Sequence, residues 1–141
     1  MNARYGFVFT PLAMALVLVA SGCSKSTSPT PPSGPAAPTG LVGGVTGGGT
    51  IVNLRWNHST DHAASGFRGY YVYANSATLV GATDAALIAA RITPTPLADT
   101  TSILSWPSPT ATTLYFSVRA VRTATGSDSL SAASNESTLH Q

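Results

Sequence analysis

The stretch LYFSVRAV, residues 114–121, decides the fold of this chain. Its apolar side chains recur at every second residue, namely Leu114, Phe116, Val118 and Ala120. Because successive side chains of a strand point to opposite faces of a sheet, this spacing predicts a β-strand with one buried face. Tyr115 and Arg119 then belong to the opposite, outward face of the same strand.

Two shorter stretches alternate in the same way. VNLRW, residues 52–56, places Val52, Leu54 and Trp56 on one face. GYYVY, residues 69–73, places Tyr70 and Val72 on one face and Tyr71 and Tyr73 on the other. Short strands separated by Gly, Pro, Ser, Thr and Asn are typical of a β-sandwich. We expect its core to be built around inward residues of these strands, namely Trp56, Tyr70, Val72, Trp106, Phe116 and Val118.

Two stretches leave their local structure open. TTSILSWP, residues 100–107, predicts a further strand that ends at Pro107. Either Ile103 or the pair Leu104 and Trp106 could face the core there. ATDAALIAARITPTP, residues 82–96, is expected to form strand or loop, with a short helix as the alternative.

Residues 36–141 resemble a fibronectin type III domain of the bacterial kind. The resemblance rests on PAAPTGLVGGVTGGGTIVNLRW (35–56), GYYVY, LYFSVRAV and, for the last strand, SLSAASNES (129–137). It implies an all-β, immunoglobulin-like β-sandwich of about seven antiparallel strands in two sheets. The chain departs from the family at Leu114, where a corner tyrosine is usual, and apolar packing of Leu114 could replace the hydrogen bond of that tyrosine.

The charge distribution excludes a nucleic-acid partner. The formal charge is +2, but Arg4 and Lys25 lie in the first 25 residues. Five arginines and five acidic residues follow from Ala36 onward, so 5 − 5 = 0. Only 9% of the chain is charged, against roughly 25% in an ordinary soluble domain. This composition favours an extracytoplasmic protein without a basic patch.

The N-terminus has the three parts of a secretory signal peptide. Arg4 precedes an apolar stretch from Phe7 to Ala20, and small residues follow. The stretch is shorter than the roughly 20 residues of a spanning helix and contains Pro11, so a transmembrane helix is the weaker interpretation.

The sequence VASGC, residues 19–23, resembles the lipobox of bacterial lipoproteins. In that family the cysteine thiol receives a diacylglycerol and becomes the new N-terminus, so the resemblance implies a lipid on Cys23, the only cysteine of the chain. The chain has Ala20 where the family prefers leucine, and an ordinary secreted protein with an incidental cysteine is the alternative. Ser24 stands where enteric-type sorting to the inner membrane uses aspartate, which favours the outer membrane or the cell surface.

These features predict three parts: a signal peptide (1–22), a lipid-anchored tether (23–35) and a fibronectin type III-like domain (36–141). The tether is rich in Pro, Ser and Thr and cannot form a core. An extended, proline-rich chain of this length could hold the domain roughly 40 Å from the membrane.

Two groups of residues are candidates for a site. His58, Asp61 and His62 could bind zinc, but a loop does not fix their spacing, and we interpret them as turn residues with Asp61 bonded to the backbone. Tyr71, Tyr73, Tyr115 and Arg119 would form an aromatic, arginine-flanked binding surface if they are exposed. The same tyrosines could instead only stabilise the sheet by cross-strand pairing.

The sequence therefore predicts a non-catalytic envelope lipoprotein that binds protein or polysaccharide partners. No serine has a histidine and an acid in a recognisable motif, and no catalytic carboxylate pair or cofactor motif stands out. The alternative is a structural spacer or assembly subunit without a discrete ligand. Exposed, clustered tyrosines would favour the binding module, and covered tyrosines would favour the spacer.

Overall fold

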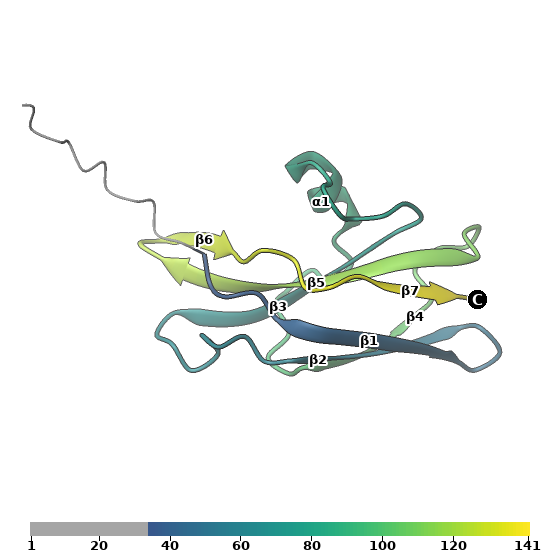
Figure 1. Ribbon diagram of the computed structural model, residues 1–141, viewed down its shortest axis with the longest axis horizontal. Helices are drawn as coiled ribbons and strands as arrows, with labels where there is room; N and C mark the ends of the chain where they lie inside the picture. The colour runs from purple at the N-terminus through teal and green to yellow at the C-terminus, as the bar shows by residue number, and fades with distance from the viewer. Residues whose placement is uncertain (1–33) are drawn as a thin grey trace, which may run out of the picture. The chain divides into compact units, whose positions relative to one another are not determined.

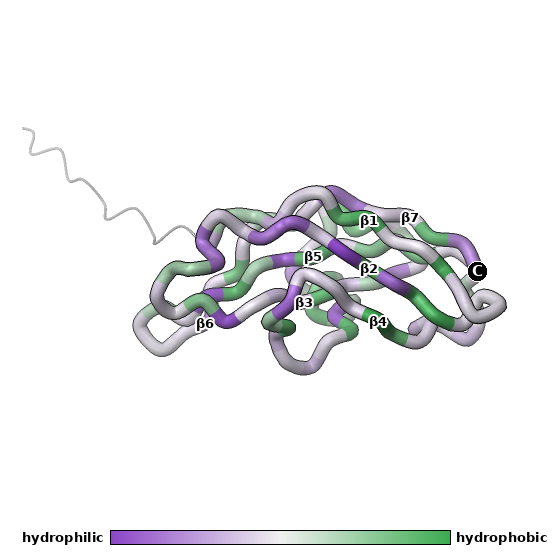
Figure 2. The backbone as a smooth tube through the Cα atoms, turned by 90° about the horizontal axis from the view of Figure 1, so that it is seen from below, coloured by the Kyte–Doolittle hydropathy of each residue, from purple (hydrophilic) through white to green (hydrophobic). Residues whose placement is uncertain are grey.

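A computed structural model describes residues 34–141, which fold into two antiparallel β-sheets packed face to face (Figure 1). The first sheet has the order β1-β2-β4, with β1 at Thr39–Thr46, β2 at Ile51–Asn57 and β4 at Thr101–Ser105. Figure 2 shows these three strands side by side in that order. Within residues 34–141 no helix is long and apolar enough to cross a membrane.

The second sheet is built on the long central strand β5, Thr113–Ala124. On one side β5 pairs with β3, Phe67–Asn75. On the other side it pairs with β6, Ser127–Leu130, and with β7, Ser137–His140. The seven strands form the predicted β-sandwich.

The last predicted strand is two short strands instead of one. Residues 131–136 lie between β6 and β7 but stay beside β5 through serine hydroxyls. The amides of Val118 and Ala120 donate to the side chains of Ser134 and Ser131 at 3.0 and 2.9 Å. The serine hydroxyls thus take the place of the backbone carbonyl acceptors that a regular strand beside β5 would provide.

The alternation predicted for β2, β3 and β5 is confirmed by the core. Tyr70, Val72, Phe116 and Val118 are fully buried between the sheets, and Trp56 exposes only 4% of its surface. The core consists of the inward residues of both sheets, namely Leu41, Val52, Leu54, Trp56, Tyr70, Val72, Leu114, Phe116, Val118, Ala120 and Leu139. Leu114 packs in this core, as expected of an apolar replacement for the corner tyrosine.

The pairing of β4 with β2 shows which side chains of β4 face the core, a question that the sequence left open. Leu104 pairs with the buried Val52, and cross-strand partners share a face of the sheet. Leu104 and Trp106 therefore pack against the core, and Ile103 is 77% exposed on the outer face.

The expectation of strand or loop for residues 82–96 is wrong for its first half, which forms the helix α1, Asp84–Ala90. Thr83 caps its N-terminus by accepting a hydrogen bond from the amide of Ala86 at 3.3 Å. Alanine-rich sequence favours a helix, and Leu87 and Ala90 are buried on its inner side. Figure 1 shows α1 outside the sandwich, on the sheet that contains β3 and β5.

The residues after α1 run along the free edge of β3. The amide of Ile92 donates to Val72 at 2.9 Å, and Leu97 and Tyr70 exchange backbone hydrogen bonds. Gly69 has a φ of +125°, and a Cβ atom there would collide with the carbonyl oxygen of Leu97. The glycine thus permits the close approach that covers this edge.

Candidate binding cleft

The predicted tyrosine surface is not exposed as a patch. Tyr71 exposes 8% of its surface and Tyr73 exposes 2%. They lie in a second apolar cluster on the outer face of the β3–β5 sheet, together with Leu79, Leu87, Ala90 and Val121. The condition for a tyrosine binding surface, exposure of Tyr71 and Tyr73, is not met because α1 and the preceding loop pack on their rings.

The other two predicted surface residues are partly accessible. Tyr115 pairs with Asn75 and Thr138 and is half-buried. Arg119 is half-buried and pairs directly with Tyr71, four residue positions along the strand from the Tyr115–Asn75 pair. The structure therefore keeps Arg119 beside Tyr71 and Tyr73 and places Tyr115 farther along the strand.

Two arginine side chains lie against the rings of the two buried tyrosines. Arg91, directly after α1, lies with its guanidinium carbon 4.6 Å from the centre of the Tyr71 ring. The guanidinium carbon of Arg119 lies 5.9 Å from the centre of the Tyr73 ring. Both contacts are within the range of cation–π attraction, so the ring faces hold the two guanidinium groups in position.

A cleft of about 430 Å³ opens between α1 and the strands β5 and β6, with these arginines in its wall. Ile88 on α1 and Leu130 on β6 line it and are 73% and 42% exposed. Tyr73 lines it as well, and Asp84 and Asp128 complete the lining. The cleft thus combines two cationic groups with exposed apolar side chains.

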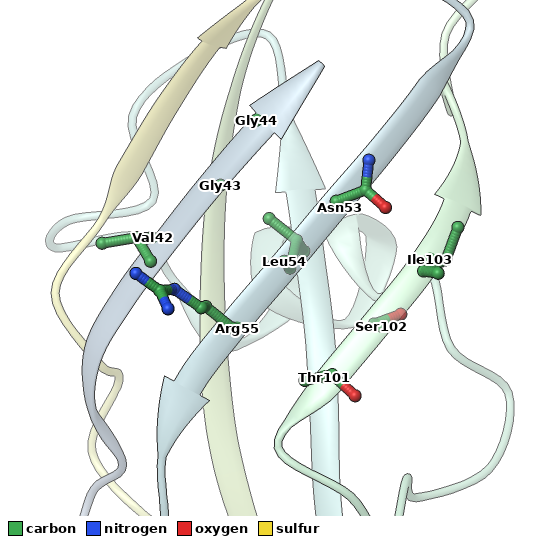
Figure 3. A pocket seen from close by; sticks show the side chains of 9 residues that line it. All are labelled: Val42, Gly43, Gly44, Asn53, Leu54, Arg55, Thr101, Ser102 and Ile103. Atoms are coloured by element: carbon green, nitrogen blue, oxygen red, sulfur yellow. The ribbon is translucent and has the colours of Figure 1, made fainter. Parts of the chain in front are cut away.

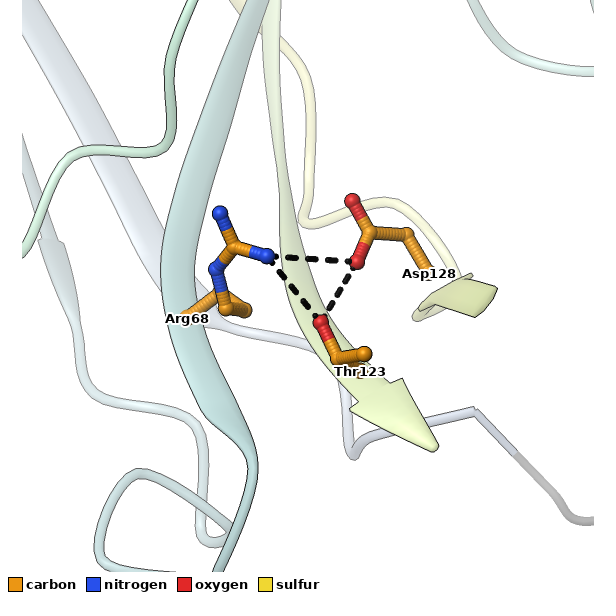
Figure 4. A network of polar contacts seen from close by, with 3 residues as sticks. All are labelled: Arg68, Thr123 and Asp128. Carbon is orange, nitrogen blue, oxygen red and sulfur yellow. Dashed lines mark hydrogen bonds and ion pairs between the residues drawn. The ribbon is translucent and has the colours of Figure 1, made fainter. Parts of the chain in front are cut away.

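The acidic residues of the cleft do not neutralise its arginines. Asp128 lies 3.7 Å from the guanidinium of Arg68 and accepts a 2.6 Å hydrogen bond from the hydroxyl of Thr123, as Figure 4 shows. Asp84 lies in the first turn of α1, where the helix dipole favours a negative charge. Within residues 34–141, neither Arg91 nor Arg119 is close enough to an acidic side chain to form an ion pair.

One polar atom of the cleft residues lacks a partner altogether. The Nε atom of Arg119 is buried and makes no hydrogen bond within the described part of the chain. A buried donor without an acceptor is costly. Because this atom is closed to solvent, a ligand can supply the acceptor only if the Arg119 side chain turns toward the cleft. Burial raises the pKa of Tyr73, although the neighbouring Arg119 and Arg91 partly oppose this, so its hydroxyl is protonated at neutral pH.

A second, shallower surface lies on the outer face of the β1-β2-β4 sheet. A hollow of about 660 Å³ is lined by Val42, Arg55 and Ile103, among others. Figure 3 shows these side chains. Gly44 of β1 pairs with Asn53 of β2 and lines this hollow. It has no side chain to fill the space above the sheet, and no other atom lies within 4 Å of where its Cβ would be. Among the described residues, no buried polar atom without a partner belongs to its lining. This surface is open and mixes polar with apolar side chains, and within the described residues its lining presents no buried polar atom without a partner.

The candidate zinc residues lie together in the loop after β2, but the carboxylate is used elsewhere. The rings of His58 and His62 are 4.0 Å apart, and both Nδ1 atoms lie 3.4 Å from the hydroxyl of Tyr70. Asp61 accepts a 2.7 Å hydrogen bond from the amide of Ala36, so the predicted bond to the backbone is confirmed. No group of three or more His, Cys, Asp or Glu side chains in residues 34–141 could hold a metal ion.

The sequence alone did not identify most of the cleft. Arg119 and Tyr73 were predicted, but Arg91, Ile88 and Leu130 were not. Arg91 follows an alanine-rich run, and only the formation of α1 brings it over Tyr71. Cys23, the predicted lipidation site, lies outside the described residues.

One comparison with solved structures supports the fold. A solved structure described as a Fn3-like protein from Clostridium thermocellum matches 77% of this chain and 94% of its own length, with 25% sequence identity and a TM-score of 0.53. The titin domains A168–A170 match 73% of this chain and 30% of their own, with 19% identity and a TM-score of 0.48. No protein-family model and no curated protein matches the sequence. The described residues thus form a fibronectin type III-like β-sandwich.

Proposed function

We propose that this protein is a non-catalytic lipoprotein of the bacterial envelope, and that its fibronectin type III-like domain binds a protein or polysaccharide partner through the Arg119 cleft. The observation that carries the proposal is the buried Nε of Arg119, which has no partner in the described residues and lies beside an open cleft. Binding of a ligand that accepts hydrogen bonds from the Arg119 guanidinium would account for this unpartnered donor.

The membrane anchor is proposed from the sequence. VASGC resembles a lipobox, and the Pro, Ser and Thr-rich tether follows directly. A single acyl chain anchors a protein only marginally, whereas two or three hold it durably. Ser24 in place of aspartate favours the outer membrane or the cell surface.

The anchor is tested by metabolic labelling with radioactive palmitate in a bacterial host. The wild-type chain should carry the label and partition into detergent, and Cys23→Ala should do neither. Equal labelling of the variant would refute the lipid on Cys23.

The binding function is tested by capture from envelope extract with the tagged full chain. Arg119→Gln should lose the partner that the wild type retains, because the variant removes the guanidinium of the cleft. Arg55→Gln is the matched control, since Arg55 is an exposed arginine on the opposite sheet. Both variants should still unfold in one cooperative transition in urea, and Arg119→Gln should shift the midpoint only by the loss of its contact with Tyr73. Equal capture by both would exclude the cleft.

A structural spacer is the second candidate, and one observation favours it. Tyr71 and Tyr73 are covered by the chain itself, so the tyrosine surface cannot serve as a recognition patch. If capture does not depend on Arg119, the spacer becomes the better account.

A further inference from the structure

We infer that the Arg119 cleft binds a carboxylate of a protein segment, an Asp or Glu side chain flanked by apolar residues. This inference rests on the proposed binding function and names its ligand. Its starting point is the juxtaposition of two guanidinium groups without acidic partners and two exposed apolar side chains around one cleft.

The charge of the ligand follows from the groups that face the cleft. Arg91 and Arg119 lie against the rings of Tyr71 and Tyr73, and neither forms an ion pair with an acidic side chain of the described residues. Of the two acidic lining residues, Asp128 contacts Arg68 and Thr123, and Asp84 lies in the first turn of α1. A planar carboxylate matches the donor geometry of a guanidinium, and such charge-assisted hydrogen bonds are the strong ones.

The apolar side chains favour a protein segment over an acidic sugar. Sugar rings bind on the faces of aromatic side chains, but Tyr71 and Tyr73 are only 8% and 2% exposed. Ile88 and Leu130, at 73% and 42% exposure, lie on opposite sides of the cleft and can contact apolar side chains that flank a carboxylate. A uronic acid has a carboxylate but no such side chains.

The other surfaces provide no comparable set of groups. The hollow of about 660 Å³ on the β1-β2-β4 sheet has one arginine, Arg55, and no buried unpartnered donor among the described residues. A neighbouring hollow of about 450 Å³ is lined by the same Arg55 and by Trp56, whose buried Nε1 has no partner in the described residues, but it has no second arginine. In the loop after β2, Asp61 is held by the amide of Ala36, and the two histidines face the hydroxyl of Tyr70. Among these surfaces, the cleft is therefore the one that combines two guanidinium groups with two exposed apolar side chains.

The test is a nuclear magnetic resonance titration of the full chain in lipid nanodiscs, observing the arginine Nε–H signals. The probe is acetyl-Leu-Glu-Leu-amide, and acetyl-Leu-Gln-Leu-amide is the neutral control of the same shape. We expect the glutamate peptide to shift the Nε–H of Arg119 and to bind roughly tenfold more tightly than the glutamine peptide, because a charge-assisted hydrogen bond is lost in the control. Arg119→Gln and Arg91→Gln should each weaken the glutamate peptide, and Arg55→Gln should not.

Three outcomes would overturn the inference. Equal binding of the two peptides would show that the carboxylate is not recognised. Glucuronate binding as tightly as the glutamate peptide would show that the apolar flanks contribute nothing and that the ligand is a sugar acid. If the glutamate peptide still shifts the Nε–H signals of the other arginines in Arg119→Gln, the peptide binds at another place. If envelope capture still depends on Arg119 in any of these cases, the proposed binding function stands and only its ligand class is wrong.

Discussion

Replacing Trp56 by alanine should destabilise the sandwich by about 3 kcal/mol, and the structure explains this magnitude. Trp56 is 4% exposed and packs edge-on against Tyr70, with ring centres 5.6 Å apart and planes at 70°. An aromatic side chain that buries about 150–250 Å² contributes roughly 4–6 kcal/mol at 25 cal/mol per Å². However, its indole Nε1 is buried without a hydrogen-bond partner in the described residues. Removing that group relieves a desolvation cost of about 1–3 kcal/mol, which lowers the expected loss.

Urea unfolding followed by far-ultraviolet circular dichroism measures this loss without relying on tryptophan fluorescence. With a slope of about 1–3 kcal/mol per M, the midpoint should fall by about 1–3 M. Trp56→Phe is the control, because it keeps an aromatic ring against Tyr70 and removes the unpartnered N–H. It should cost less than about 1.5 kcal/mol. An unchanged midpoint in Trp56→Ala, or a phenylalanine variant as unstable as the alanine one, would refute the reasoning.

Three further substitutions test other parts of the fold. Gly69→Ala should cost roughly 2 kcal/mol or more in urea unfolding, because the φ of +125° and the carbonyl of Leu97 leave no room for a Cβ; wild-type stability would contradict this. Asn135→Ala should cost about 1–3 kcal/mol and accelerate hydrogen exchange at the Leu41 amide, because the Asn135 side chain accepts from the Leu41 amide and donates to the Leu41 carbonyl, both at 2.8 Å, and alanine removes both bonds. Unchanged exchange there would argue against the paired contact. Burial raises the pKa of Tyr73 above its ordinary value of 10.0, so the unfolded chain loses this proton first and stability should fall as pH rises through 10.0. Tyr73→Phe should show a shallower fall, and a slope equal to that of the wild type would exclude this cause.

The alternation of apolar residues was sufficient to predict the sandwich. In β2 and β5 the hydrophobic side chains recur with period two, so the parity of Trp56 and Phe116 follows from the sequence. The parity of β4 did not follow, because Ile103 and Leu104 are both large and apolar. It is determined by pairing with β2, which places Leu104 opposite Val52. Register is a long-range property that a local pattern does not contain.

The candidate site was less predictable because it depends on α1. An alternating strand such as GYYVY has two apolar faces, and the sequence does not show that the second face is also covered. The cover comes from Leu79 and Leu87, which lie on either side of the cap residue Thr83 and reach the tyrosines only because residues 84–90 form a helix. Arg119 could be named from its position on an outward face, but Arg91 could not.

The central claim, that a protein partner binds at the Arg119 cleft, is tested most directly by photo-crosslinking in living cells. A photoreactive phenylalanine analogue is placed at Ile88, which lines the cleft, or at Ile103, on the outer face of the opposite sheet. The two positions are equally suitable because their exposures are 73% and 77%. The account predicts a discrete protein adduct from position 88 that disappears when Arg119→Gln is added, and no adduct from position 103. An adduct from position 103 alone, or one from position 88 that persists without Arg119, would contradict it.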